Sequence, residues 1–362
     1  METIKISVRQ FTILVILFLI GSSILIVPGI IAQEAKQDAW IAAILGVVVA
    51  LLLVKLYNVV GSIEPSMTLV EMNEKLLGKW IGKIVTISFL FFTIVVSGEL
   101  LYFVGSFMQT QLMPETPLLA FNLLFISVII MGVRYGLETI ARSAEIIFPW
   151  FILLFLLTVF LLSPNFDFAN TQPILETKMK PMIYGMLLFL SIFSFSPVVL
   201  LMIFPIAVND SQQAKKALFK GTLIAGIILV IIVMLTIVVL GAETTSKLMY
   251  PSYSLAKRIE IGNFLQRLEM FIAFMWIITI FFKLLIYFYA SVIGLAQLVN
   301  IKEYRPLTLP LGLLIVVLSV IVHPTTVDSM QYNKGAWLPF GATFGILLPL
   351  LLLVIAKIRK KM

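Results

Sequence analysis

The 362-residue chain is 61% hydrophobic, carries charge on only 12% of its residues and has a formal net charge of +8. It contains no cysteine and one histidine, which excludes disulfides, cysteine nucleophiles and cysteine- or histidine-cluster metal sites. The mean hydropathy of +1.10 predicts an all-α integral membrane protein in a lipid bilayer rather than a soluble fold. The basic residues form no patch typical of nucleic-acid binding, so no nucleic-acid partner is expected.

Ten apolar runs are long enough to cross a bilayer as helices. They cover about residues 10–32, 39–60, 84–108, 118–133, 143–162, 183–205, 218–241, 268–296, 307–322 and 337–356. An even number of spans places both ends of the chain on one side. Lys and Arg are about twice as frequent in the connections on that side, so the positive-inside rule predicts that both termini are cytoplasmic.

The first run is interrupted by Gly21-Ser22-Ser23, followed by Pro28-Gly29. Ser194-Phe195-Ser196-Pro197 interrupts a later run, about half the chain away. Helix breaks at matching places in two halves point to a transporter-type binding site. The pattern predicts a 5+5 inverted repeat of the LeuT-like type with helices 1 and 6 broken; the alternative is that these are ordinary Gly/Pro kinks.

This interpretation makes residues 1–362 a single transmembrane permease-like domain, with repeat 1 at about 9–162 and repeat 2 at about 183–356. No phosphate-binding Gly-x-x-x-x-Gly-Lys-Ser/Thr motif occurs, and no catalytic constellation or cofactor motif is found, so the chain is not expected to be an enzyme or to hold a cofactor. The connection at 64–79 predicts a short amphipathic helix. A second helix is predicted at 251–259, either as an outer lid over the central site or as an interfacial helix.

Two ionisable residues lie deep inside predicted spans, Glu99 in the third and Lys283 in the eighth. Charges within the membrane face the bundle interior and are candidates for function. A free amino acid offers an ammonium group for Glu99 and a carboxylate for Lys283 or for the free amides of the first break. The alternatives are a structural Glu99–Lys283 ion pair, or hydrogen bonds from each to nearby backbone. Tyr287 lies on the same helix face as Lys283.

Several segments resemble a known family. They are the run Tyr250-Pro251-Ser252-Tyr253-Ser254-Leu255, the run 262–269 (GNFLQRLE), Trp276 and Tyr287, together with the Gly21/Pro28 break, Pro205 and the basic C-terminal tail. The chain as a whole resembles the B subunit of spore germination nutrient receptors. That endospore germination permease family belongs to the amino acid/polyamine/organocation (APC) superfamily.

The resemblance implies a ten-helix permease in the inner membrane of a dormant spore, where it senses a nutrient, often an amino acid. It also implies two partner subunits, an A-type membrane protein and a C-type lipoprotein. The family's ligand pocket, matched onto this sequence, falls at Gly21, Ser22, Ser23, Val95, Glu99, Ser194, Phe195, Ser196, Lys283 and Tyr287. Ser22-Ser23 replaces a more glycine-rich permease pattern, and Lys283 brings a charge to the pocket; both features leave the ligand open.

Three functions are compatible with these features. The first is a receptor that binds a nutrient and signals through its partner subunits. The second is a proton-coupled amino acid transporter, with Glu99 or Lys283 as the group that titrates. The third is a scaffold whose pocket has lost its ligand. A receptor and a transporter can share this fold, and fold alone does not fix function. The family resemblance is what favours the receptor.

Overall fold

The computed structural model describes residues 5–258 and 268–359, and these are helical apart from loops and one isolated β-bridge between Ile6 and Val208. The longer helices are α3 (Ala39–Gly61), α5 (Lys79–Phe107), α6 (Leu118–Tyr135), α7 (Leu137–Leu162), α8 (Met179–Phe193), α9 (Ser211–Leu240), α12 (Met270–Leu298) and α13 (Thr308–Ile321). The shorter ones are α1 (Val8–Ile20), α2 (Ser23–Ala35), α4 (Leu69–Leu77), α10 (Ala242–Lys247), α11 (Pro251–Ala256), α14 (Thr326–Lys334), α15 (Trp337–Ala342) and α16 (Leu348–Ile358). Short 3₁₀ or π segments are η1 (Lys36–Asp38), η2 (Met108–Leu112), η3 (Ser163–Asn165), η4 (Phe168–Thr171), η5 (Ser196–Met202), η6 (Arg305–Leu307) and η7 (Thr343–Leu347).

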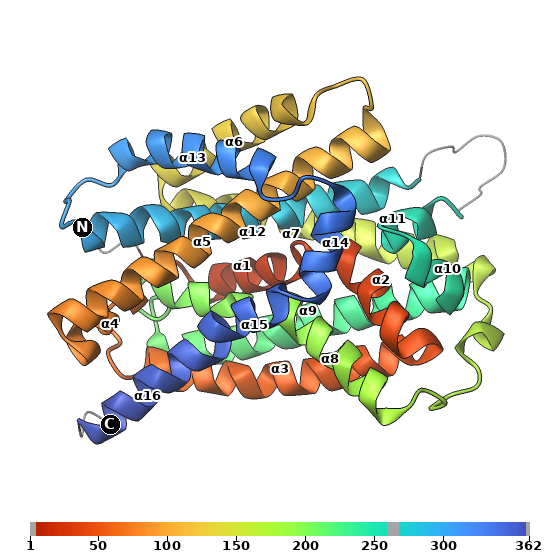
Figure 1. Ribbon diagram of the computed structural model, residues 1–362, viewed down its shortest axis with the longest axis horizontal. Coiled ribbons are helices and arrows are strands. Elements are labelled where there is room, and N and C mark those ends of the chain that lie inside the picture. The colour runs from red at the N-terminus through yellow and green to blue at the C-terminus, as the bar shows by residue number, and fades with distance from the viewer. Residues whose placement is uncertain (1–4, 259–267, 360–362) are drawn as a thin grey trace.

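The described helices include eight stretches long and apolar enough to cross a membrane, or nine if α13 and α14, bent by 97°, form one span. This is fewer than the ten expected, for two reasons. Helix α1 has 13 residues, too few to count by itself, and the 39-residue stretch Ser23–Gly61 counts once although it contains both α2 and α3. Lys36 leaves the helical conformation at φ 48°, and Figure 1 shows α3 running back from the end of α2. Ten spans are recovered when α1 with α2 is one broken span, α3 is the next, and the bent pair of α13 and α14 is also counted as one span.

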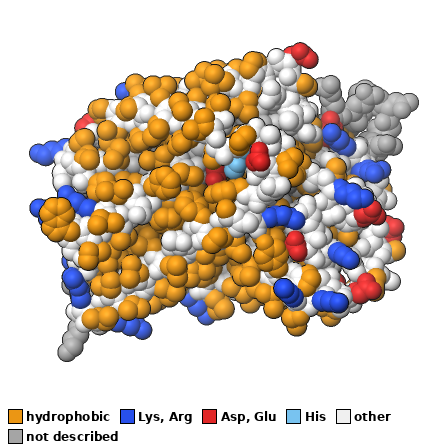
Figure 2. Space-filling view, viewed as in Figure 1, with side chains coloured by type: hydrophobic (Ala, Val, Ile, Leu, Met, Phe, Trp, Pro, Cys, Tyr) orange, Lys and Arg blue, Asp and Glu red, His pale blue; other side chains and the backbone are white. Residues whose placement is uncertain are grey.

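The surface of the bundle is that of a multi-pass membrane protein. Large apolar side chains point outward from the long helices, for example Phe91 at 61% exposure, Leu124 at 69% and Phe160 at 72%. Figure 2 shows apolar side chains across the middle of the face and charged side chains gathered toward its two ends. Helix α4 and the end of α16 lie at one end of the molecule, and α10 and α11 lie at the other (Figure 1).

Helix α1 occupies the centre of the bundle. A capping box begins it, in which the Gln10 amide donates to Ser7 Oγ and the Ser7 amide donates to Gln10 Oε1. Every residue from Ile13 to Ile20 is buried, and the helix packs against α7, α9 and α12. An element that is apolar on all sides must be surrounded by protein or lipid, and here it is surrounded by protein.

Both predicted helix breaks are confirmed. Helix α1 ends at Ile20 and α2 begins at Ser23, so the chain leaves the helix at Gly21-Ser22. Helix α8 ends at Phe193, and the chain continues as a 3₁₀ segment, η5, from Ser196. Pro197 at the start of η5 has no amide hydrogen to continue the α-helical ladder. The fold therefore brings two interrupted helices into the middle of a membrane bundle.

Of the two helices predicted in connections, α4 is present at Leu69–Leu77, capped by Thr68 and Glu71. The predicted 251–259 helix is present as α11, which is buried against α2 and α9. Ser252 Oγ donates a hydrogen bond of 2.6 Å to the Ile24 carbonyl, so α11 covers α2. This agrees with a covering role rather than an interfacial one. Ile259 and residues 262–267 of the quoted motif lie outside the described residues.

Candidate functional site

The first break passes unusually close to α12. A Cβ atom placed on Gly21 would lie 2.3 Å from Lys283 Cδ and 2.8 Å from the Phe18 carbonyl oxygen. Only glycine therefore fits between the end of α1 and the Lys283 side chain. The Gly21 carbonyl, freed from the helix, accepts a hydrogen bond of 3.3 Å from Thr279 Oγ1 of α12. The first break is therefore held against α12 by both close packing and a hydrogen bond.

Lys283 connects the two breaks. Its side chain is 2% exposed, and Nζ donates to Ser22 Oγ at 3.1 Å and to the Ile192 carbonyl, near the end of α8, at 3.4 Å. Nζ also lies 5.9 Å from the centre of the Phe18 ring. A buried amine needs such partners because transfer of an unpaired charge out of water is costly. The Ser22 and Ile192 oxygens provide part of the stabilisation that an opposite charge would give to the buried amine.

Glu99 of α5 lines the same space. It is 4% exposed, and its Oε1 has no hydrogen-bond partner among the described residues. Tyr332 of α14 is a polar side chain next to it. Glu99 and Lys283 form no ion pair within 4.0 Å, so the alternative of a direct structural pair does not hold among the described residues. The carboxyl group is left underbonded in the core of the protein.

Both ionisable groups line a small cavity of 20 Å³. That volume holds about one water molecule. The side chains around it come from the first break and seven helical elements, and they are Ser22, Ile26, Val96, Glu99, Leu100, Phe103, Ile192, Ser196, Lys283, Asn333 and Trp337. The structure thus brings together residues up to 315 positions apart (337 against 22) around one buried site of mixed polar and apolar character.

Four of the ten predicted site residues line this cavity: Ser22, Glu99, Ser196 and Lys283. Gly21 does not line it but makes the close passage of Lys283 possible. The hydroxyl of Ser23 donates to the Leu19 carbonyl at 3.0 Å, so it joins the start of α2 to the end of α1 across the break.

The other predicted residues lie outside the lining. Tyr287 stacks on Phe18 at 5.6 Å, and its buried hydroxyl has no partner among the described residues. Val95 is only partly buried. The side of α5 that lines the cavity is formed instead by Val96, Glu99, Leu100 and Phe103, which recur at helical spacing. Ser194 and Phe195 belong to the second break but face other parts of the core.

Seven lining residues were not predicted: Ile26, Val96, Leu100, Phe103, Ile192, Asn333 and Trp337. The first five are apolar and look like any other membrane residue in the sequence. Asn333 and Trp337 belong to α14 and the start of α15, in and beside a connection that the sequence shows as polar. A polar residue near the end of an apolar run was the only available signal for Asn333.

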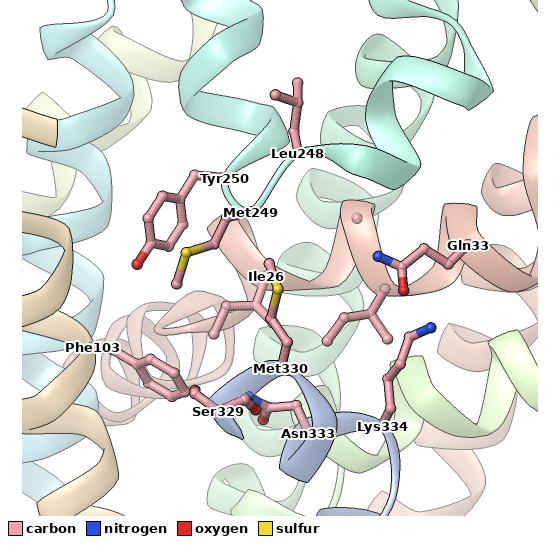
Figure 3. A pocket seen from close by; sticks show the side chains of 12 residues that line it. Ile26, Gln33, Phe103, Leu248, Met249, Tyr250, Ser329, Met330, Asn333 and Lys334 are labelled. Atoms are coloured by element: carbon pink, nitrogen blue, oxygen red, sulfur yellow. The ribbon is translucent and has the colours of Figure 1, made fainter. Parts of the chain in front are cut away.

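A second cavity lies on the α10–α11 side of the site and is shown in Figure 3. Its volume is 30 Å³, and it shares Ile26, Phe103 and Asn333 with the central cavity. These three side chains therefore form the partition between the two spaces. A larger cavity of 400 Å³ lies at the α4 end, lined among others by Thr68, Gln297 and Arg305, and it shares no lining residue with the central one.

Comparison with known proteins gives consistent results. The sequence profile of the family described as "spore germination protein" matches residues 5–327. Spore germination protein KB of Bacillus subtilis (strain 168) is 32% identical over 367 aligned residues, covering 100% of this chain and 97% of that one. Spore germination protein YndE of the same organism is 26% identical, covering 99% and 98%. Spore germination protein B2, also of B. subtilis, is 23% identical, covering 99% and 96%.

Among solved structures, the chain is similar to Mhp1, a nucleobase-cation-symport-1 family transporter in a closed conformation with bromovinylhydantoin bound. The TM-score is 0.65 at 13% identity, covering 94% of this chain and 77% of that one. At that identity the similarity concerns the fold, and it confirms the expected LeuT-like membrane fold. The profile match over most of the chain and the 32% identity to protein KB show that this chain belongs to the spore germination protein family.

Proposed function

We propose that this protein is the nutrient-sensing membrane subunit of a spore germinant receptor and that it binds an amino acid between Glu99 and Lys283. The observation that carries the proposal is the placement of these groups. A carboxyl group and an amine line one buried cavity, and neither is paired with an opposite charge among the described residues. A zwitterion that enters between them satisfies both groups at once.

The polarity of the site sets the orientation of the ligand. Its ammonium group approaches the unpartnered Glu99 Oε1, and its carboxylate approaches the Lys283 amine and Ser22. The first turn of α2 begins at Ser23 without a side-chain cap, and its amide groups favour a negative charge. The predicted pocket residues Ser23, Val95, Ser194, Phe195 and Tyr287 do not line the cavity and are given no ligand contact in this proposal.

Binding requires a change of conformation, because 20 Å³ is too small for an amino acid. A ligand that binds only an expanded site shifts the population toward that state. Partner subunits of the A type and C type then convert this shift into the germination signal. The protein lies in the spore inner membrane with both termini in the cytoplasm, so that the basic α4 and α16 end faces inward.

A second candidate, a proton-coupled amino acid transporter, is favoured by one observation. The 400 Å³ cavity at the α4 end resembles the beginning of an exit path on the side opposite the partition of Ile26, Phe103 and Asn333. In that case Glu99 or Lys283 carries the proton.

The test is binding and uptake of labelled L-amino acids by the purified protein in liposomes, with and without a proton gradient. Saturable binding without accumulation supports the receptor, whereas accumulation driven by the gradient makes the protein a transporter. Replacement of Lys283 by Met is expected to weaken binding by about 10- to 100-fold at normal protein abundance, the range for a hydrogen bond to a charged group. Lys247→Met, at an exposed pair with Glu243, is the matched control and leaves binding unchanged. Unchanged affinity in Lys283→Met would contradict the proposed site.

A further inference from the structure

Helix α14 is set apart from the rest of the bundle by a sharp bend. It lies 97° from α13, after a break at residues 322–325. His323 lies in this break, 4% exposed, with its ring 5.1 Å from Tyr102 and 5.2 Å from Tyr332. The aromatic packing links the hinge to α5 on one side and to α14 itself on the other.

The same helix forms one wall of the proposed site. Tyr332 is a polar neighbour of the Glu99 carboxyl group, and Asn333 lines both the central cavity and the second cavity. Figure 3 shows α14, with Met330 and Asn333, on one side of the second cavity, and the Leu248–Tyr250 segment on the opposite side. Removal of α14 would therefore open the central cavity toward the α10–α11 end.

Two polar contacts attach α14 to the neighbouring helices. Lys334 Nζ lies 3.5 Å from Glu34 Oε1 of α2, and both side chains are about one-third exposed. The Lys334 carbonyl accepts a hydrogen bond of 2.7 Å from the Tyr184 hydroxyl of α8. Helix α2 follows the first break and α8 precedes the second, so both contacts join α14 to the broken spans.

From this arrangement we infer that α14 is a lid on the site, that Tyr332 positions Glu99 for the ammonium end of the ligand, and that the Glu34–Lys334 pair holds the lid shut. A ligand ammonium group competes with Tyr332 for the Glu99 carboxyl group. Occupancy of the site then loosens the contact between lid and site, so that the lid reports whether ligand is present. The ligand-dependent part of this inference rests on the proposed amino acid site. The lid and its latch, the Glu34–Lys334 pair, do not rest on it.

The chain has no cysteine, which permits a direct test of access to the cavity. Val96→Cys places one reporter thiol in the lining, on α5 and outside the lid. The rate of its modification by a small cationic methanethiosulfonate is measured in detergent without ligand. Addition of Glu34→Gln is expected to raise that rate about two- to five-fold, the effect of losing a partly exposed ion pair. The charge-swapped variant, Glu34→Lys with Lys334→Glu, restores the slow rate.

The matched control is Glu64→Gln, which breaks the Glu64–Lys75 pair of 2.7 Å at the α4 end. It leaves the modification rate of the reporter unchanged if the latch is specific. Equal rates with and without Glu34→Gln, or an equal increase from Glu64→Gln, would overturn the latch.

Tyr332→Phe keeps the ring that packs on His323 and Trp337 but removes the hydroxyl. It is expected to raise the modification rate as well, with an unchanged melting temperature, because the lid loses its link to Glu99. An unchanged rate would remove Tyr332 from the lid contact.

A final arm separates the lid from the ligand. A mixture of the twenty common L-amino acids is expected to change the modification rate of Val96→Cys and to have less effect when Tyr332 is Phe. If the latch variants change the modification rate as expected and the mixture changes it in none of the variants, the lid is supported and the amino acid site is contradicted. If the mixture slows modification of the thiol but the latch variants leave the rate unchanged, the amino acid site is supported and the lid is contradicted.

Discussion

The two broken spans look alike in the sequence, but the structure uses them differently. At the first break the Lys283 side chain packs directly against Gly21, and Ser22 accepts a hydrogen bond from the Lys283 amine. At the second break the exposed backbone is satisfied by the protein itself. The Tyr57 hydroxyl lies 2.9 Å from the Ser194 carbonyl and 2.8 Å from the Gly345 carbonyl, and so holds this break to η7. The first interruption holds the Lys283 amine through Ser22, whereas the second supplies Ser196 to the cavity lining and is held to η7 by Tyr57.

The largest effect is expected at Gly21. Gly21→Ala forces Lys283 and the end of α1 apart, which costs about 1–3 kcal/mol and displaces the amine. We expect a lower thermal midpoint in detergent and loss of amino acid binding. Gly185→Ala is the control within α8, since its Cβ would meet nothing closer than Ala35 Cβ at 3.5 Å. Equal stability of the two variants would mean that the first break is not tightly packed.

The second break is tested by Tyr57→Phe. Loss of the hydroxyl leaves two buried carbonyls without this donor, which is expected to cost about 1–2 kcal/mol of stability. Ligand affinity should change little, because Tyr57 does not line the central cavity. Thermal unfolding and binding are measured side by side, with the exposed Tyr135→Phe as control. A large loss of affinity without destabilisation would show that the contact between Tyr57 and the second break acts on ligand binding rather than on the fold.

A smaller effect is expected for Ser22→Ala. It removes the nearer acceptor of the Lys283 amine, so binding of amino acids should weaken by about tenfold while the fold is kept. The neighbouring Ser23→Ala removes only the hydrogen bond to the Leu19 carbonyl, which does not involve Lys283, and should leave affinity within about twofold. Similar affinities for both variants would contradict the distinction between the two hydroxyls.

The smallest effect is expected for Ser194→Ala. Its hydroxyl is buried and has no partner among the described residues, so replacement should change stability by no more than about 0.5 kcal/mol. Affinity should also be unchanged in a binding titration. A clear loss of binding would show that this hydroxyl meets the ligand in the expanded state.

The local chemistry of the chain was enough to locate several parts of the site. Glycine and proline change backbone geometry over a few residues, so both breaks were visible before any tertiary contact was known. Glu99 and Lys283 were visible because a charge within an apolar run is rare. The extent of the spans was also predicted closely; for example, α6 runs from Leu118 to Tyr135 against an expected 118–133. The internal repeat at 9–162 and 183–356 stays a prediction.

The sequence by itself determined the membrane class, the positions of the two breaks and the two ionisable groups, because hydropathy and backbone preference act over short distances. It did not determine which oxygens meet Lys283, that Glu99 lies apart from it, or that α14 forms a wall of the cavity. Those relations join residues such as Ser22, Lys283 and Asn333, which are far apart in the chain. Apolar residues facing lipid and those facing a cavity are alike in sequence, so only the packing of the helices in three dimensions decides between them.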